Sequence, residues 1–226
     1  MTRRRAITSL NGSRSSRFPR PGRGALLALL GGLLFALPAR AQIVINEVRP
    51  KDSGGSTANQ LVELHNTGAS AVNIGGWIFC HQFDYGAVLP AGFTIASGGY
   101  AVMHFNASGT NTATDVFFPG QVLASTTDLA LYANANFTSA SAIRAFIQFG
   151  GHPGSGRESV AQAAGLWTSG QFVPGVANGH SIELCAGSPA AVTSYVEQAT
   201  PTIGQENGCG VPVQKSSWSK LKSIFH

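Results

Sequence analysis

From residue 43 onward, the alternation of apolar and polar positions predicts a series of short β-strands. Residues 43–48, IVINEV, are rich in β-branched side chains, which favour extended backbone. In residues 60–66, QLVELHN, Val62 and Leu64 point to one face of the strand, and Leu61, Glu63 and His65 point to the other. This alternation is typical of a strand with one face buried.

Further apolar runs that fit strands lie at residues 71–81, 92–95, 99–105, 129–134 and 142–150. Turn signals such as Pro90-Ala91-Gly92 and Ser97-Gly98-Gly99 separate them at short intervals. Many short strands at this spacing predict an all-β sandwich or barrel. Residues 157–165, RESVAQAAG, fit either one or two turns of helix or an extended loop.

The last residues have a different pattern. In residues 211–226, Trp218, Leu221 and Phe225 have helical spacing, and three lysines give this tail a charge of +3. Residues 42–214 carry four basic and ten acidic residues, a formal charge of −6. We therefore predict a basic amphipathic C-terminal tail. It is either a helix that frays or docks at the end of the domain, or a tag for export or sorting machinery, a partner or an anionic membrane surface.

The N-terminus has the three parts of a secretory signal peptide. Residues 3–23 contain seven arginines and no acid, and the apolar run 24–37 precedes Ala39-Arg40-Ala41, a small-residue cleavage site. The 14-residue run is shorter than the roughly 20 residues that a membrane span needs. We predict a signal peptide over residues 1–41, cleavage after Ala41, and a protein that is periplasmic, displayed on the cell surface or extracellular.

Cleavage would reverse the sign of the net charge. The full chain has a formal charge of +5, but eight of its fifteen basic residues lie in the predicted signal peptide. The remaining seven basic and ten acidic residues give −3, which argues against nucleic acid as a partner. The 185 residues that remain suffice for one domain, which we place at residues 42–210.

Three cysteines remain in the predicted mature chain. In an oxidising compartment, an odd number favours one disulfide and one free thiol. We pair Cys185 with Cys209, because both lie near the C-terminus and close a short loop. Cys80 lies in the apolar stretch GWIFCH and is expected to be a buried thiol.

Glu47 and Glu63 lie on neighbouring predicted strands and form a candidate carboxylate pair. A hydrolase would need them in a cleft, as general acid and base. We favour a structural role instead, in which they accept hydrogen bonds from loop amides. Asn46 and Asn66 are expected to hold turns through their side-chain amides.

Sequence motifs for metals and nucleophilic catalysis are missing. The six histidines never have the spacing of a metal motif, and neither a G-x-S-x-G elbow nor a D-x-D-x-D-G calcium loop occurs. We therefore expect no metal, no cofactor and no enzymatic activity.

Two tryptophans have distinct expected roles. Trp77 is expected in the core of the sandwich. Trp167 lies in a Gly/Ser-rich stretch with Phe172, and either stacks on a sugar or protein partner or caps the open end of the sandwich. Arg157 and Glu158 would supply the polar part of such a binding surface. A carbohydrate-binding module is thus one alternative function, and a hydrolase that uses Glu47 and Glu63 is another.

Several segments, in order, resemble the lamin tail domain family in its bacterial secreted form. They are Ile45-Asn46-Glu47, residues 60–66, Gly76-Trp77-Ile78-Phe79, Leu89-Pro90-Ala91-Gly92, Gly98-Gly99-Tyr100 and the turn PTIGQEN at residues 201–207. The resemblance spans residues 43–208. It implies an immunoglobulin-like β-sandwich with Greek-key-type connections, and a non-catalytic role in protein interaction or extracellular structure.

This chain departs from the family pattern in two places. Residues 134–180 are longer than the minimal pattern, and Gln60 stands where an aromatic residue often precedes the second strand. The resemblance names no ligand, so a protein and a surface polysaccharide both remain possible partners.

Overall fold

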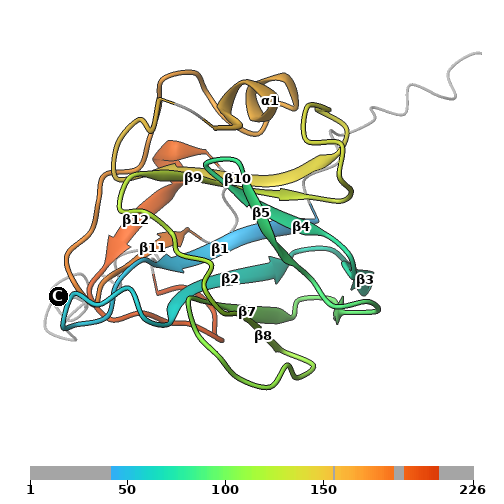
Figure 1. Ribbon diagram of the computed structural model, residues 1–226, viewed down its shortest axis with the longest axis horizontal. Coiled ribbons are helices and arrows are strands. Elements are labelled where there is room, and N and C mark those ends of the chain that lie inside the picture. The colour runs from blue at the N-terminus through green and yellow to red at the C-terminus, as the bar shows by residue number, and fades with distance from the viewer. Residues whose placement is uncertain (1–41, 155, 186–190, 209–226) are drawn as a thin grey trace, which may run out of the picture. The chain divides into compact units, whose positions relative to one another are not determined.

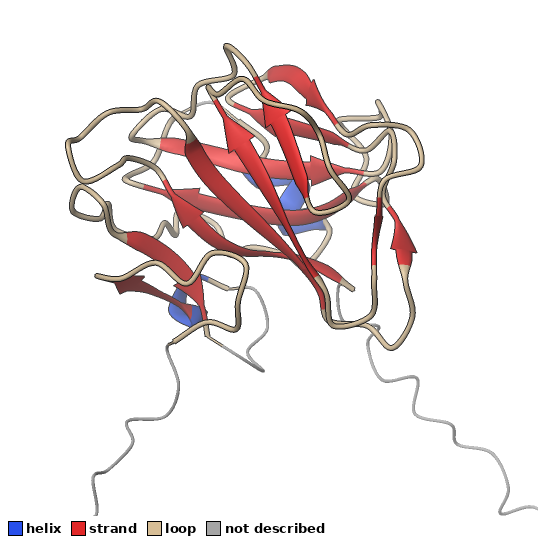
Figure 2. Cartoon of the chain, turned by 90° about the horizontal axis from the view of Figure 1, so that it is seen from below, coloured by secondary structure: helices blue, strands red, loops and turns tan. Residues whose placement is uncertain are grey.

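The computed structural model describes residues 42–154, 156–185 and 191–208. Two β-sheets lie face to face in this part of the chain (Figures 1 and 2). The strands of the six-stranded sheet are β12 (Tyr195–Gln198), β11 (Ser181–Leu184), β1 (Ile43–Arg49), β2 (Gln60–Asn66), β7 (Tyr100–Phe105) and β8 (Asp115–Phe118), in that spatial order. Those of the four-stranded sheet are β10 (Ile143–Phe149), β9 (Thr127–Tyr132), β4 (Ile78–His81) and β5 (Asp84–Val88). A small ribbon pairs β3 (Val72–Asn73) with β6 (Thr94–Ile95).

The chain moves repeatedly between the two sheets. After the β1–β2 hairpin it crosses to β4 and β5, returns to β7 and β8, crosses again to β9 and β10, and comes back to β11 and β12. All pairs are antiparallel except β7 with β8, which are parallel. The prediction of an all-β, immunoglobulin-like sandwich with Greek-key-type connections is confirmed.

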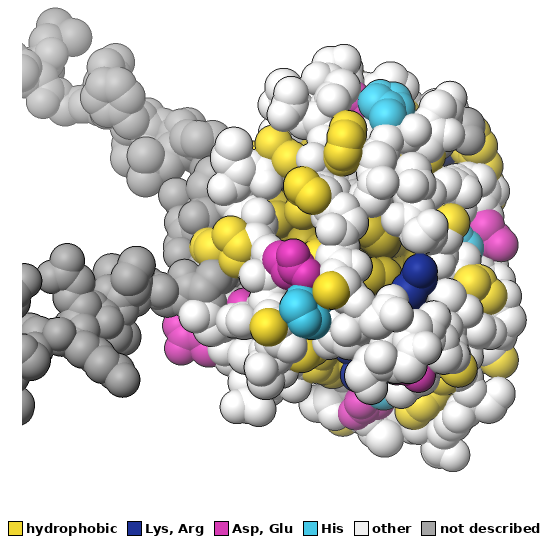
Figure 3. Space-filling view, turned by 90° about the vertical axis from the view of Figure 1, so that its left-hand side faces the viewer, with side chains coloured by type: hydrophobic (Ala, Val, Ile, Leu, Met, Phe, Trp, Pro, Cys, Tyr) yellow, Lys and Arg dark blue, Asp and Glu magenta, His cyan; other side chains and the backbone are white. Residues whose placement is uncertain are grey.

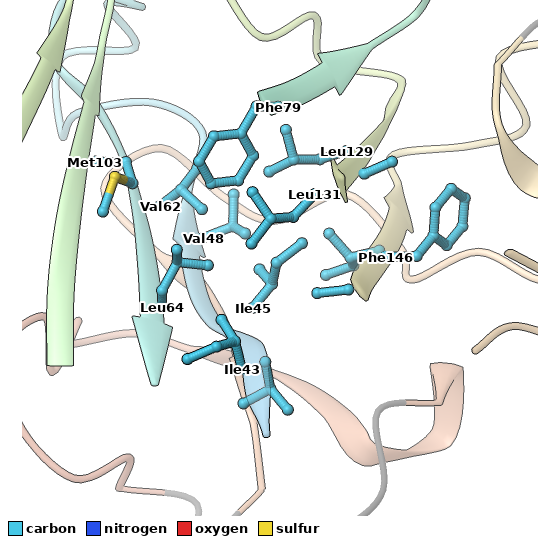
Figure 4. Close-up of a cluster of buried hydrophobic side chains, with 14 of the residues drawn as sticks. Ile43, Ile45, Val48, Val62, Leu64, Phe79, Met103, Leu129, Leu131 and Phe146 are labelled. Carbon is cyan, nitrogen blue, oxygen red and sulfur yellow. The ribbon is translucent and has the colours of Figure 1, made fainter. Parts of the chain in front are cut away.

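The hydrophobic core fills the space between the sheets (Figure 4). The predicted alternation in β2 is observed, because Val62 and Leu64 are fully buried and point inward. Phe79 and Leu131 meet them from the other sheet. Each such side chain contributes about 1.5–3 kcal/mol to the free energy of folding when it is removed from water.

A β-bulge in β1 sets the two faces of the six-stranded sheet. Ile45 pairs with Leu64 and Glu47 pairs with Glu63, so the extra residue Asn46 has no partner of its own. A bulge of this kind places two residues of one strand opposite one of the next. Ile45 therefore stays in the core, whereas Asn46 and Glu47 both reach the outer face of the sheet.

The described part of the chain contains little helix. α1 (Glu158–Ala163) forms within residues 157–165, whose sequence fits either helix or an extended loop, and it packs on β10 through the buried Ala161. A short 3₁₀ turn, η1 (Val192–Ser194), precedes β12. Among the described residues, no helix has the length and apolar character to cross a membrane.

Trp77, which we expected in the core of the sandwich, is only partly there. It lies just before β4 and is only partly buried at the margin of the core, while Phe79, two residues later, occupies the centre. Cys80 is fully buried and forms no disulfide with a described residue. The predicted signal peptide 1–41, Cys209 and the tail 211–226 lie outside the described residues, so their predicted roles remain predictions.

Candidate functional site

Three glutamates lie side by side on the outer face of the six-stranded sheet. Glu47 on β1 pairs in register with Glu63 on β2 and, on its other side, with Glu183 on β11. All three side chains have an exposed fraction of 0%. The sequence predicts the pair Glu47 and Glu63. It does not predict Glu183, because this residue lies 136 positions after Glu47 in the chain.

The segment Pro201–Asn207, here called the strap, covers these carboxylates. The backbone N–H of Thr202 donates to both oxygens of Glu47, at 3.1 and 3.2 Å. The Thr202 hydroxyl lies 3.1 Å from Glu47 Oε2 and 2.7 Å from Glu183 Oε1. The N–H of Gly204 donates to Glu63 Oε2, and Gly204 has a φ of +86°, a conformation that glycine adopts without steric strain.

Two asparagines fix the strap to the sheet. Nδ2 of Asn46 donates to Glu63 Oε1 at 2.6 Å and to Asn207 Oδ1 at 2.8 Å. Nδ2 of Asn207 donates in turn to the backbone carbonyls of Asn46 and Leu184, at 2.9 and 2.7 Å. The bulge that turns Asn46 outward is what brings its amide into this network.

Burial has the largest effect on the pKa values of Glu47 and Glu63. Burial is the main cause that raises the pKa of Glu63 from 4.5 to about 7. The negative charges of Glu47 and Glu183 raise this pKa further, whereas the hydrogen bonds from Asn46 and Gly204 lower it. Burial also raises the pKa of Glu47. Among the described residues, no lysine or arginine forms an ion pair with any of the three. Burial and the neighbouring carboxylates therefore favour the protonated form of Glu63 more than solvent favours that of a free glutamate.

This arrangement is poorly suited to hydrolysis. A general acid or base needs access to a substrate proton, and the strap occupies the side from which a substrate would approach. The carboxylate oxygens are instead engaged with amide and hydroxyl donors of the protein. Among the described residues, no group of three or more His, Cys, Asp or Glu side chains has the geometry to hold a metal ion.

Asn66 organises a second set of turns. Its Nδ2 donates to the carbonyls of Ser70, Ile95 and Ala96, at 2.8, 3.0 and 2.9 Å, and its Oδ1 accepts from the N–H of Gly68 at 3.0 Å. One buried side chain thus connects the turn after β2 to the end of β6.

Gln60, the departure from the family pattern, is also fully buried. Its Nε2 donates to the carbonyls of Pro50 and Leu123, and its Oε1 accepts from the N–H of Leu123, each at 2.8 Å. An amide with all these partners ties together two loops, a task that an aromatic ring at this position could not perform.

The outer face continues beyond the strap as an open groove of about 720 Å³, here called the outer groove. Strands β2, β7 and β8, the turn near β6 and the strap itself line it. The lining residues include Leu61, Ile95, Tyr100, Val102, His104, Asp115, Ile203 and Gly204. The sequence signals did not reveal this groove, because its walls come from four separate parts of the chain.

Trp167 is buried, with 6% of its surface exposed. Its ring contacts those of Phe146 and Tyr195, with centroids 5.4 and 6.3 Å away, and its Nε1 donates to the carbonyl of Gln171 at 2.8 Å. The Trp167 ring is therefore not the exposed platform that the carbohydrate-binding hypothesis requires. Phe172 is 41% exposed, and its ring stacks on no aromatic ring among the described residues.

The other two proposed binding residues, Arg157 and Glu158, make contacts within the protein. The guanidinium of Arg157 lies over the rings of Phe83 and Tyr85, with centroids 4.6 and 5.4 Å away. Glu158 pairs with His152 at 2.8 Å and accepts hydrogen bonds from Gln162 and from the N–H of Gly170. Glu158 therefore lies beside the loop that carries Trp167 and Phe172, but the Trp167 ring is buried there and Arg157 packs on Phe83 and Tyr85.

The match to a family model agrees with the architecture. The model of the lamin tail domain family matches residues 37–195. A search of the curated proteins found no match. One similar solved structure is that of a DUF4876 family protein from Bacteroides thetaiotaomicron VPI-5482. It is 10% identical, with 77% of this chain and 75% of that chain covered and a TM-score of 0.45. Because the family model matches well over half of its length, this chain belongs to the lamin tail domain family.

Proposed function

We propose that this chain is exported across the inner membrane and acts outside the cytoplasm as a non-catalytic module, with a role in protein interaction or surface structure. The observation that carries the non-catalytic part is the covered carboxylate cluster. The two acids best placed for hydrolysis, Glu47 and Glu63, are fully buried and are hydrogen-bonded to the strap. They stabilise the fold and have no access to a substrate.

The export part of the proposal is supported by the N-terminal sequence. A run of arginines, an apolar segment and a small-residue site precede β1 with only one residue between Ala41 and Ile43. Removal of residues 1–41 would leave the first strand intact, so the predicted cleavage site is compatible with the fold.

A disulfide between Cys185 and Cys209 fits the same compartment. Cys185 follows Leu184 directly, and Asn207, two residues before Cys209, donates a hydrogen bond to the carbonyl of Leu184 at 2.7 Å. The chain entering Cys209 therefore starts close to Cys185. Such a bond would hold the strap over the glutamates.

The experiment is the intact mass of the exported protein, measured before and after thiol alkylation without reductant. We expect a mass that begins at Gln42 and a single alkylated cysteine. A mass that retains residues 1–41 would overturn export, and three alkylated cysteines would overturn the disulfide.

The non-catalytic part has its own test. A Glu63→Gln variant should match the wild-type protein when both are assayed against panels of glycoside, ester and peptide substrates. Hydrolysis by the wild-type protein that is lost in a folded Glu63→Gln variant would overturn the proposal.

A further inference from the structure

We propose that the outer groove binds the chain's own C-terminal segment, residues 211–226. This inference goes beyond the proposed function, because it assigns an occupant to a surface that export and the lack of catalysis leave unexplained.

The size of the groove favours a short segment. Its volume of about 720 Å³ lies in the range of roughly 300–1,000 Å³ that is typical of sites for small ligands. Such a groove takes a few side chains of a peptide, whereas a folded partner would need a broader surface.

The lining of the groove combines an apolar floor with a polar rim. Leu61 and Val102, on β2 and β7, form part of the floor. The ring of Tyr100 is held in place by stacking on His65, with centroids 4.3 Å apart. Ile203 of the strap adds an apolar wall. These residues would pack against apolar side chains such as Trp218, Leu221 and Phe225, which recur at helical spacing in the tail.

The rim carries a fixed negative group. Oδ1 of Asp115 lies 3.0 Å from His104 Nε2, and Oδ2 accepts from the hydroxyls of Thr112 and Thr114 at 3.1 and 2.8 Å. The hydrogen bond to His104 lowers the pKa of Asp115, so its carboxylate is ionised at neutral pH. Its side chain is still 35% exposed and accessible to a lysine.

The charges of the two parts are complementary. The described residues carry four basic and ten acidic side chains, and basic side chains are sparse on the face in Figure 3. The tail brings Lys215, Lys220 and Lys222 close together in sequence. An acidic domain attracts a basic segment over a distance of about 10 Å at 0.1 M salt.

The tail begins close to the groove. Ile203 and Gly204 line the groove, and the described chain ends at Gly208, only four residues after Gly204. The ten residues from Gly208 to Trp218 can span up to about 35 Å. Because the tail is tethered, its effective concentration at the groove would be on the order of millimolar, so even weak contacts would populate the bound state.

Zero-length carbodiimide cross-linking of the exported chain tests this proposal, with the linked peptides identified by mass spectrometry. We expect a link between Asp115 and at least one of Lys215, Lys220 and Lys222. Asp84, an acid on β5 in the other sheet, is the internal control and should link to none of them.

Two variants test whether the cross-link depends on the groove. Asp115→Asn should abolish the link, and Ala113→Arg, a substitution at an exposed residue that lines the groove, should reduce it without lowering the thermal stability. Equal linkage of the tail to Asp84, no link to Asp115, or an exported chain whose mass lacks residues 211–226 would overturn the proposal. In a mixture of isotopically light and heavy chains, links between the two would show that the groove binds the tail of a second copy and would overturn the intrachain arrangement.

Discussion

The hydroxyl of Thr202 lies between Glu183 and Glu47, 2.7 Å from an oxygen of the first and 3.1 Å from an oxygen of the second. A hydroxyl has one hydrogen, which it donates to one carboxylate or shares between the two. This single hydroxyl of the strap therefore links the carboxyl groups of two strands, β1 and β11. The raised pKa values of Glu47 and Glu63 mean that these two carboxyl groups keep their protons to higher pH than a free glutamate does.

The first prediction is that the domain is more stable in mild acid than at slightly basic pH. The unfolded chain releases the Glu63 proton near pH 4.5, while the folded chain keeps it up to about pH 7. Between these values the folded state binds more protons, so its stability falls as the pH rises. We expect a loss of roughly 2–3 kcal/mol from this residue between pH 4.5 and 7.5, measured by urea unfolding. Glu63→Gln should reduce this pH dependence, and Asp84→Asn, at an exposed position of β5, should not.

The second prediction concerns Thr202. Thr202→Ala removes the hydroxyl that lies between two buried carboxylates and should cost about 1–3 kcal/mol in the free energy of unfolding. Thr202→Ser keeps the hydroxyl and should retain most of the stability. Equal losses in the two variants would show that the methyl group, not the hydrogen bonds, is responsible.

A third prediction is that Asn207 controls the closure of the strap. Asn207→Ala removes the side chain that binds Asn46 and two backbone carbonyls. The amide hydrogens of Thr202 and Gly204 should then exchange with solvent faster, which hydrogen exchange measured by mass spectrometry would detect. Amides of β9, in the opposite sheet, provide the control and should keep their protection.

The fourth prediction concerns the cysteines. If the proposed disulfide between Cys185 and Cys209 forms, its reduction should lower the free energy of unfolding by about 3 kcal/mol, the value expected for a loop of this length in the chain-entropy model. Cys80 should resist alkylation in the folded protein, because it is fully buried and burial raises the pKa of its thiol. Rapid alkylation of Cys80 under native conditions would contradict its place in the core.

Local patterns in the sequence predicted the parts of this fold that depend on local chemistry. The inward direction of Val62 and Leu64 followed from strict alternation, because side chains of a strand point to opposite faces in turn. Glu47 and Glu63 stood out because each is an acid inside an otherwise apolar strand. Their shared site with Glu183 was not predictable, since the pairing of β1 with β11 joins residues far apart in the chain.

The aromatic residues mark the limit of such reasoning. Trp167 lies among glycines and serines, a composition typical of surface loops, yet its indole is buried against Phe146. The long connection that carries it folds back over the four-stranded sheet through α1, which packs on β10. Burial of a loop residue depends on what the loop covers, and the sequence of the loop alone does not contain that information.

The position of β1 has a consequence for the order in which the protein can fold. β1 is the first strand of the domain, but it lies between β2 and β11, and the hydroxyl of Tyr195 donates to the carbonyl of Ile45 in it at 2.9 Å. One edge of β1 therefore has no hydrogen-bonded partner strand until β11, near the end of the domain, is available to pair with it. If the chain crosses a membrane starting from its N-terminus, the six-stranded sheet cannot be completed until β11 and β12 have also crossed. The domain would therefore stay unfolded, and able to pass through a narrow channel, during most of its translocation.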